Sequence, residues 1–455
     1  MKMGGSLSRK WIAWLSKKII YPIWDLWDDS LKLKELSRLE SSQWLKEKEL
    51  LDIQEKRFGR LLNYALEHSP HYKNVIREYD ICLDGDFLKT LSQFPVTKKS
   101  DVRENLIDFL STEYKQDQLV IAKTGGSTGF SLSLYFDKTC QENRNAAAMR
   151  TDKWAGWRQG DVRGDLWGNP PIPKTFKQKL RNCLLDKIIY LDTMDLNTSS
   201  MTEFVSRINQ CGIQVIFGHA HSIYLLAKFI DENKLDIPSI NGIISTSMML
   251  LDHERLKIET VFSCKVTNRY GCEEVGLIAS ECEVHDGMHV NMEHVIVELL
   301  DDFGHPVKDG EVGKVVVTDL NNFGMPLIRY QIEDMAVMSS SKCSCGRESA
   351  LLQSLSGRVA DFLKKTDGSM VAGISLIERT LTKIKGLEQI QLVQNELTTI
   401  EVNRVKASDY TERSDELLIT ELETVFSHDV KVIIKDIDVI PQMANGKYRF
   451  AICNL

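Results

Sequence analysis

The chain has 455 residues, with 57 basic and 64 acidic side chains, so its formal net charge at neutral pH is −7. Apolar residues make up 43% of the sequence, which is enough for a buried core and excludes a disordered or fibrous protein. A net acidic chain without a long basic block also argues against nucleic acid as the main partner.

The cysteine content and the hydropathy pattern indicate the compartment. Ten cysteines in 455 residues are too few for a disulfide scaffold. No apolar signal core with a small-residue cleavage site opens the sequence, and no run of about 18 uncharged apolar residues could span a membrane. We therefore expect a cytoplasmic protein in a reducing compartment, in which clustered cysteines are considered first as metal ligands.

Residues 1–60 have helical periodicity and are predicted to form a helical N-terminal layer. Basic residues are interleaved in this segment with five tryptophans: Trp11, Trp14, Trp24, Trp27 and Trp44. Two interpretations are open. The tryptophans pack on the main domain, which we favour, or residues 1–30 contact a membrane surface and the protein is a membrane-peripheral assembly factor.

Residues 61–357 are predicted to form a large α/β domain. From residue 90 to 330, short β-branched runs such as 214–217 and 242–245 alternate with helical stretches. Val295–Leu300 and 314–318 are joined by a turn-rich segment, and we expect them to form a β-hairpin.

Residues 358–455 are predicted to form a small α+β domain that acts as a mobile lid. The hydrophobic pattern restarts after Gly357 and Arg358. It then predicts a strand or turn at 361–371, helices at 374–384 and 414–426, and strands at 387–393 and 430–439.

The strongest local signal is a segment rich in glycine and hydroxyl groups, which directly follows the apolar run 119–122. It consists of Thr124, Gly125, Gly126, Ser127, Thr128 and Gly129. Backbone N–H groups and hydroxyls in such a segment can surround an oxyanion, as phosphate-binding loops do. The spacing is not that of a Walker loop, and a flexible Gly/Ser turn is the alternative.

Three further segments carry candidate charges. Glu274, in the sequence Tyr-Gly-Cys-Glu-Glu at 270–274, is placed at the end of a strand where a carboxylate could hold Mg²⁺ or simply face solvent. Arg329 and Asp334 interrupt a strand-like run and form either a structural ion pair or ligands for phosphate and ribose. Lys447 lies in a turn near the C-terminus, either as a surface lysine or on a lid that delivers a cation.

A metal site is the fifth candidate. Cys343 and Cys345 place two thiols on one tight turn, and Cys282 lies upstream with His285, His289 and His294. Two thiols from one turn and a Cys/His pair from another would complete a four-coordinate structural zinc site. Free buried thiols are the alternative.

In their order and rough spacing, these motifs resemble the core motifs of the adenylate-forming superfamily of acyl-CoA synthetases and ligases. More narrowly, the sequence is similar to the phenylacetate-CoA ligase-like group and its capsular-polysaccharide-biosynthesis (CapK-like) relatives. The supporting segments are 68–72, 94–98, 281–282, 287–290 and 343–347. The resemblance covers nearly the whole chain, from about residue 50 to 450.

The resemblance implies ATP-dependent adenylation of a carboxylic acid with loss of pyrophosphate. Acyl transfer would follow, to a thiol of CoA or a carrier protein or to an amine, in polysaccharide or secondary-metabolite biosynthesis. The implied cofactors are ATP, Mg²⁺, a structural Zn²⁺ and, for thioester formation, CoA.

The resemblance also implies roles for individual residues. Residues 124–129 hold the triphosphate and Glu274 holds Mg²⁺. Tyr270 and Gly271 border the adenine, Asp334 binds the ribose, Arg329 and Arg358 support the nucleotide, and Lys447 bridges the acyl and phosphate oxygens. The acid pocket draws on Trp167, Gly168, Asn169, His219, His221, Ser245, Thr246 and Ser247. Zinc is bound by Cys282, His289, Cys343 and Cys345, with His285 as the rival histidine.

The sequence departs from the family pattern at the predicted hinge. Relatives often carry an acidic residue two positions after the arginine of the Gly-Arg pair, where this chain has Ala360, followed by Asp361. Adenylation is therefore better supported than a thioester step that requires domain rotation. A catalytically weak nucleotide- or acyl-binding protein on the same fold is the alternative.

Overall fold

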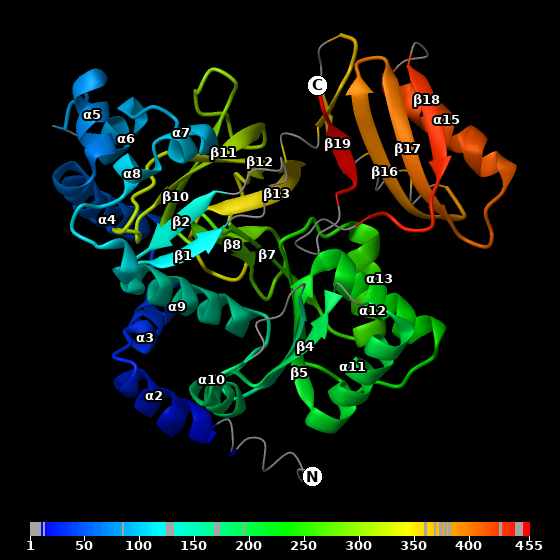
Figure 1. Cartoon of the computed structure of the whole chain (residues 1–455), viewed down its shortest axis with the longest axis horizontal. Coiled ribbons are helices and arrows are strands. Elements are labelled where there is room, and N and C mark those ends of the chain that lie inside the picture. The colour runs from blue at the N-terminus through cyan, green and yellow to red at the C-terminus, as the bar shows by residue number, and fades with distance from the viewer. Residues whose placement is uncertain are drawn as a thin grey trace.

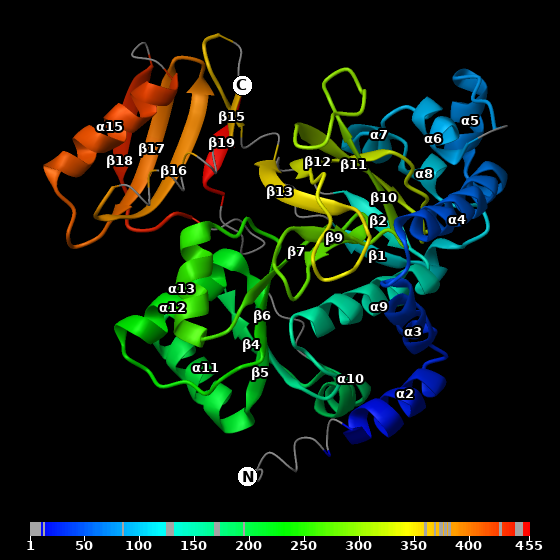
Figure 2. The ribbon, with the colours of Figure 1, turned by 180° about the vertical axis from the view of Figure 1, so that it is seen from behind.

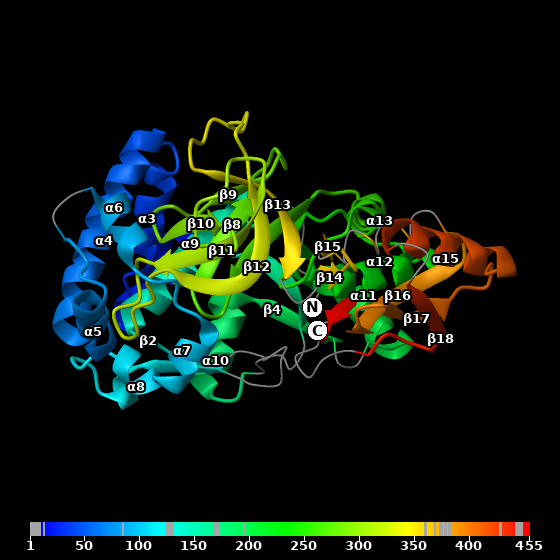
Figure 3. The same ribbon diagram turned by 90° about the horizontal axis from the view of Figure 1, so that it is seen from above.

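A computed structural model describes residues 11, 14–83, 86–123, 132–167, 173–193, 196–358, 362–367, 370–372, 376, 380, 384–426, 430–441 and 449–455. Figure 1 shows a large part built on one long sheet and a smaller C-terminal part with its own sheet and helix. Seen from above, the C-terminal part lies at the end opposite the N-terminal helices (Figure 3). The predicted α/β fold with a small C-terminal domain is confirmed.

The large sheet has 11 strands in the order β10-β11-β12-β13-β9-β8-β7-β6-β5-β3-β4. Its parallel half consists of β3 (Val162–Trp167), β4 (Ile188–Asp192), β5 (Ile213–His219), β6 (Gly242–Thr246) and β7 (Val266–Cys272). Its antiparallel half consists of β8 (Gly276–Glu281), β9 (Met288–Val290), β10 (Val295–Leu300), β11 (Val312–Asp319), β12 (Tyr330–Met338) and β13 (Leu351–Arg358). The pairing of β10 with β11 confirms the predicted hairpin.

Helices cover both faces of the parallel half, as continuous apolar strands require. One face packs on α11 (Thr198–Cys211), α12 (Ala220–Glu232) and α13 (Asp252–Phe262) through a shared apolar cluster. The other face packs on the end of α9 (Lys138–Trp154) through Val215 and Ile244. The segment after β3 forms α10 (Phe176–Arg181) and a π-helix, η3 (Asn182–Asp186).

The N-terminal helices continue past the predicted limit of residue 60. They comprise a π-helix, η1 (Ser16–Ile20), then α2 (Tyr21–Trp27), α3 (Lys32–Ser42), α4 (Glu47–His68), α5 (Pro70–Glu78), α6 (Phe87–Gln93), α7 (Lys99–Glu104) and α8 (Leu106–Phe109). A short hairpin of β1 (Val120–Lys123) and β2 (Ser133–Phe136) follows, after a 3₁₀ turn at Gln116–Gln118. Figure 2 shows this helical layer from behind, beside the antiparallel half of the sheet.

The preferred prediction, that the tryptophans pack on the main domain, is correct only for Trp24. Its ring is 5% exposed and packs with Tyr21 against Leu185. The other four are at least half exposed: Trp11, Trp14, Trp27 and Trp44. Trp11, Trp14 and Trp27 lie on the side of the N-terminal helical segment that faces away from the protein. Trp44 follows α3, and its ring centroid lies 4.5 Å from the Arg347 guanidinium. Among the described residues, no helix combines the length and apolar character needed to cross a membrane.

Buried charges attach α3 to the sheet. The carboxylate of Glu293 accepts hydrogen bonds from Ser42 at the end of α3 at 2.6 Å and from Arg150 of α9 at 2.7 Å. Burial raises the pKa of Glu293, but the charge and hydrogen bond of Arg150 outweigh burial and hold that pKa at about 2. The helical layer is therefore fastened by an ionised side chain.

Glu293→Gln is expected to destabilise the protein at neutral pH by about 3 kcal/mol, because it leaves Arg150 buried without its counter-charge. The folded pKa lies below the ordinary value of 4.5, so this contribution is complete above pH 4.5 and is lost as pH falls toward about 2. Urea unfolding should therefore show a smaller difference in the free energy of unfolding between variant and parent at acidic pH than at neutral pH. An equal difference in the free energy of unfolding at both pH values would contradict an ionised Glu293. The control is Glu55→Gln, at an exposed position of α4.

The C-terminal domain has a four-stranded sheet in the order β18-β17-β16-β19, beside a two-stranded β14-β15 sheet. Its elements are β14 (Phe362–Lys364), β15 (Met370–Ala372), β16 (Leu387–Glu396), β17 (Thr399–Lys406), α15 (Glu412–Phe426), β18 (Lys431–Asp436) and β19 (Ala451–Cys453). The sequence analysis missed β17, although Ile400 and Val402 alternate with polar residues there. Most of the helix predicted at 374–384 falls where the structure gives no description.

Candidate active site

Two residues predicted to border a nucleotide are joined directly. The Tyr270 hydroxyl on β7 donates a hydrogen bond to Oδ2 of Asp334 on β12 at 2.9 Å. Asp334 is also the register partner of Arg358 on β13. Strands that are separated in the sequence thus bring three predicted nucleotide-binding positions together.

Gly271 is required because the backbone of β8 passes very close to this position of β7. A Cβ atom built at this position would lie 2.4 Å from the carbonyl oxygen of Gly276 on the adjacent strand β8. Any larger residue would force the two strands apart, because backbone cannot move aside as a flexible side chain can. The glycine therefore sets the position of the turn that carries Glu274.

Glu274 is a buried carboxylate rather than a surface one, with 8% of its area exposed. Its Oε1 lies 3.7 Å from Nζ of Lys99 and 3.5 Å from the Tyr330 hydroxyl. Arg144 donates a hydrogen bond to the Glu274 carbonyl at 2.7 Å and also pairs with Asp319. The turn is fixed, and its carboxylate offers the oxygen donor that Mg²⁺ prefers.

Lys99 is the residue at this site that the sequence analysis missed. It directly follows the segment 94–98 that supported the resemblance. Thr97 forms an isolated parallel bridge with Tyr330, and the Thr97 N–H donates to the Arg329 carbonyl at 2.9 Å. This bridge carries the start of α7, and with it the Lys99 ammonium, to Glu274.

Arg329 pairs with Glu298, so the ion pair with Asp334, one of the two interpretations of the sequence, is not formed. Its guanidinium contacts both carboxylate oxygens of Glu298, at 3.0 and 3.1 Å. It also donates to the carbonyls of Ser92 and Phe94. Burial raises the pKa of Glu298, and the Arg329 charge opposes that rise. In this structure Arg329 fastens the 92–97 segment to the sheet, and its role toward a nucleotide stays a prediction.

Three residues predicted for the acid pocket lie at the carboxyl ends of neighbouring parallel strands. Trp167 ends β3, His219 ends β5 and Thr246 ends β6, and the Trp167 and His219 rings are 4.4 Å apart. Ligands of open α/β sheets bind at this edge. Ser245 points to the opposite face from Thr246, since side chains alternate along a strand. Its buried hydroxyl has no hydrogen-bond partner among the residues that the structure describes.

A partly buried ion network supports these strand ends and was not predicted. Arg163 of β3 donates a hydrogen bond to Asp165 at 2.7 Å, and Arg269 of β7 donates one to Asp152 of α9 at 2.7 Å. Both guanidinium groups lie against the Phe217 ring, at 4.8 and 5.6 Å from its centroid. Phe217 in turn stacks on Trp167, so the network holds the aromatic side chains in place.

His221 contacts the C-terminal domain, a role that the sequence analysis did not predict. Its Nδ1 lies 2.5 Å from Oε1 of Glu254, and its Nε2 lies 3.2 Å from the amide nitrogen of Gln389 on β16. The Phe450 ring meets the imidazole edge-on, with centroids 5.1 Å apart. The Gln389 side chain also accepts a hydrogen bond from the Ile440 N–H at 3.2 Å.

Several predicted residues fall outside the described part of the chain. They are the phosphate-binding segment 124–129, Gly168 and Asn169 of the acid pocket, the hinge residues Ala360 and Asp361, and Lys447. For Arg358 the structure describes the backbone only.

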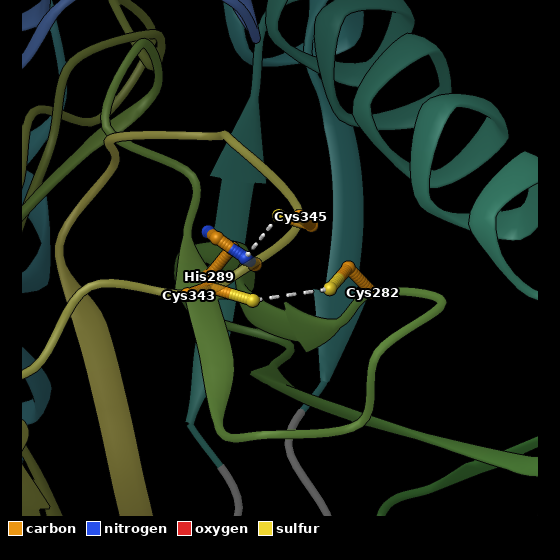
Figure 4. Close-up of side chains that lie close together, drawn as sticks. All are labelled: Cys282, His289, Cys343 and Cys345. Atoms are coloured by element: carbon orange, nitrogen blue, oxygen red, sulfur yellow. Dashed lines mark hydrogen bonds between the residues drawn. The ribbon is translucent and has the colours of Figure 1, made fainter.

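The four predicted zinc ligands come together (Figure 4). The donor atoms of Cys282, His289, Cys343 and Cys345 all lie within 4.8 Å of one another. Cys282 Sγ is 3.7 Å from Cys343 Sγ, and Cys345 Sγ is 3.3 Å from Nε2 of His289. In a tetrahedron, zinc–sulfur bonds of about 2.3 Å place two sulfurs about 3.8 Å apart, and a zinc–nitrogen bond of about 2.1 Å places the nitrogen about 3.6 Å from a sulfur. The two distances are close to these values, so the set fits a structural zinc ion.

The surroundings of this cluster favour metal binding. The His289 Nδ1 lies 2.9 Å from the Ser349 hydroxyl, which orients the ring with Nε2 toward the thiols. Burial, together with the Arg347 charge, lowers the pKa of His289 to about 4, so the imidazole is neutral and able to ligate. Burial also raises the pKa of the Cys345 thiol, but hydrogen bonds from Arg347 outweigh burial and lower that pKa overall. The rival His285 lies instead 3.2 Å from Glu281.

Comparisons with known proteins agree with the motifs. Residues 363–454 match the CapK C-terminal domain family. Over 413 residues the chain is 23% identical to protein CapK of Staphylococcus aureus, covering 90% of both sequences. It is also 24% identical to a phenylacetate-coenzyme A ligase of Thermus thermophilus, covering 70% of this chain and 72% of that one. The chain is thus similar to CapK and to phenylacetate-coenzyme A ligases, as the order of its motifs predicted.

The fold agrees with that of solved superfamily members. The structure of 2-hydroxyisobutyryl-CoA ligase in the postadenylation state with 2-HIB-AMP matches with a TM-score of 0.74 at 18% identity, over 91% of this chain and 92% of that one. The same enzyme in its thioesterification state matches over the same shares with a TM-score of 0.60. Both matches show that the chain has the fold of this ligase.

Proposed function

We propose that the protein activates a carboxylic acid with ATP and then transfers the acyl group to an acceptor. This proposal rests on the contact between the C-terminal domain and the carboxyl ends of the parallel strands of the large sheet. Ile440 and Phe450, on either side of the segment that contains Lys447, lie at Gln389 and His221. His221 is two residues beyond His219, at the strand edge predicted to bind the acid. The flanks of this segment therefore support a role for Lys447 at that edge.

In the first step an oxygen of the acid carboxylate attacks the α-phosphorus of ATP. The bond from that phosphorus to the bridging oxygen breaks, and pyrophosphate leaves. Negative charge spreads over the phosphate oxygens in such a reaction, so catalysis depends on positioning and electrostatic stabilisation. Glu274 would hold Mg²⁺, which neutralises phosphate charge when bound, while Tyr270 and Asp334 position the nucleoside and Lys447 adds a cation.

In the second step the acceptor attacks the acyl carbonyl and AMP leaves. We place the thiol of CoA first, because the phenylacetate-coenzyme A and 2-hydroxyisobutyryl-CoA ligases are CoA ligases by name. A carrier-protein thiol, or an amine in polysaccharide or secondary-metabolite biosynthesis, is the alternative acceptor. The alternative function is that of a protein that binds ATP or an acyl group without turnover. It is supported by Ala360, which replaces the acidic residue that relatives often carry at the predicted hinge.

Pyrophosphate release measured across a panel of carboxylic acids tests the first step. Lys447→Ala should lower the rate by about 100-fold or more, the loss of about 3 kcal/mol of transition-state stabilisation. Lys431→Ala, at an exposed position of the same domain, is the matched control. ATP binding without pyrophosphate release would favour the binding protein. Neither binding nor release with any acid would contradict the proposal. Mass spectrometry of products formed with CoA or amines then identifies the acceptor.

A further inference from the structure

An apolar ridge runs along the exposed side of the N-terminal helical segment. Its members recur at every fourth residue: Trp11, Leu15, Ile19, Ile23 and Trp27, with Trp14 and Leu26 beside them. Ile23 is 61% exposed and Leu26 is 83% exposed. A large contiguous apolar surface facing water usually marks an interaction site.

The opposite side of the same segment is anchored in the protein. The Tyr21 hydroxyl donates to the Leu185 carbonyl at 3.1 Å, and Tyr21 and Trp24 pack against Leu185. The Leu33 N–H donates to Asp25 at 3.0 Å, which ties α2 to α3. The ridge is therefore held in a fixed orientation on the surface of the large domain.

The sequence of the N-terminal segment is basic, although the whole chain is acidic. Residues 1–27 contain five basic side chains and one acidic side chain, Asp25, which is buried and paired with Lys32. Lys17 and Lys18 are exposed beside the ridge. The local charge is thus opposite in sign to the net charge of −7.

Helix α10 extends this surface. Phe176 is 81% exposed, and Lys177 pairs with Asp28 at 2.7 Å while its ammonium lies 5.2 Å from the Trp27 ring centroid. Figures 1 and 2 both show α10 beside α2, at the end of the molecule away from the C-terminal domain. We call the ridge together with Lys17, Lys18 and Phe176 the N-terminal face.

We propose that the N-terminal face docks the protein on a membrane that carries anionic lipids. Tryptophan, leucine and isoleucine enter the boundary between headgroups and acyl chains, and flanking lysines are attracted to anionic headgroups. The acidic remainder of the chain is repelled by such a surface, so the two effects together select one orientation. A second copy of the chain fits less well, because a symmetric contact would bring the lysines of both faces together.

Co-sedimentation of the full chain with vesicles tests this proposal. We expect binding to vesicles of phosphatidylcholine with phosphatidylglycerol, and weaker binding to phosphatidylcholine alone or at high salt. Lys17→Glu with Lys18→Glu should weaken binding by about tenfold or more. Ile23→Ser with Leu26→Ser should weaken it on both kinds of vesicle, since apolar insertion does not depend on lipid charge.

The controls change the same residue types at similarly exposed sites elsewhere. Ile107→Ser with Leu256→Ser, at positions that are 68% and 69% exposed, should leave vesicle binding unchanged. Equal loss in these controls and in the N-terminal variants would overturn the proposal, as would equal binding of the parent to neutral and anionic vesicles. A dimer in light scattering that dissociates in the Ile23→Ser, Leu26→Ser variant would assign the face to a second copy instead. Unchanged thermal unfolding of each variant excludes misfolding as the cause of lost binding.

Discussion

Cys343→Ser is expected to remove one bound zinc ion per chain and to lower the free energy of unfolding by about 3 kcal/mol or more. Cys343 and Cys345 lie in the loop before β13, whereas Cys282 directly follows β8 and His289 lies in β9. A zinc ion bound to all four would join two loops that are 61 residues apart in the sequence at Cys282 and Cys343. Loss of one thiolate leaves three donors, too few for a closed structural site.

Metal analysis of the purified protein and urea unfolding measure these two effects. Cys140→Ser is a control matched for burial, because it also places a hydroxyl at a buried thiol but lies outside the cluster. It should keep the zinc and cost less stability than Cys343→Ser. A parent protein without zinc, or one whose stability is unchanged by a chelator, would refute the zinc site. The thiols would then contribute only by packing in the protein interior.

Glu274→Gln is expected to reduce pyrophosphate release by about 100- to 1000-fold, the scale of losing one fixed electrostatic contact to the transition state. The amide keeps the shape of the side chain but loses the negative charge that Mg²⁺ requires. More Mg²⁺ should then be needed for half-maximal rate. Binding of the acid should change little, because the predicted acid pocket lies on different strands.

Glu273→Gln is the matched control, since Glu273 lies in the same turn and is exposed. Pyrophosphate release at varied Mg²⁺ concentration distinguishes the two variants. A Glu274→Gln variant with the parent's rate and Mg²⁺ dependence would refute the metal assignment. Thermal unfolding should be followed in parallel, because this variant also loses the ion pair with Lys99.

The position of Lys99 shows why part of the site escaped sequence reasoning. Its approach to Glu274 depends on the bridge between Thr97 and Tyr330, residues that are far apart in the chain. Arg329 is a similar case, because its partner Glu298 comes from another strand of the sheet. No local pattern identifies such partners, since strand register decides which charges meet.

The cluster of Cys282, His289, Cys343 and Cys345 is the opposite case. Two thiols on one turn, with a cysteine and histidines upstream, made a metal site one of two interpretations, and the family resemblance favoured it over free buried thiols. The choice between His285 and His289 still needed the fold, which turns His285 toward Glu281 and His289 toward Cys345.

By itself the sequence determined the α/β class, the resemblance to adenylate-forming ligases, the β10-β11 hairpin and three of the four clustered residues, Cys282, Cys343 and Cys345. These features follow from local periodicity, turn chemistry and the order of motifs along the chain. Only the tertiary structure decided which charges are paired, which face of the N-terminal helix stays exposed, and where the C-terminal domain meets His221. Each of those outcomes depends on surfaces contributed by distant segments, and burial and ion pairing exist only after those segments have packed.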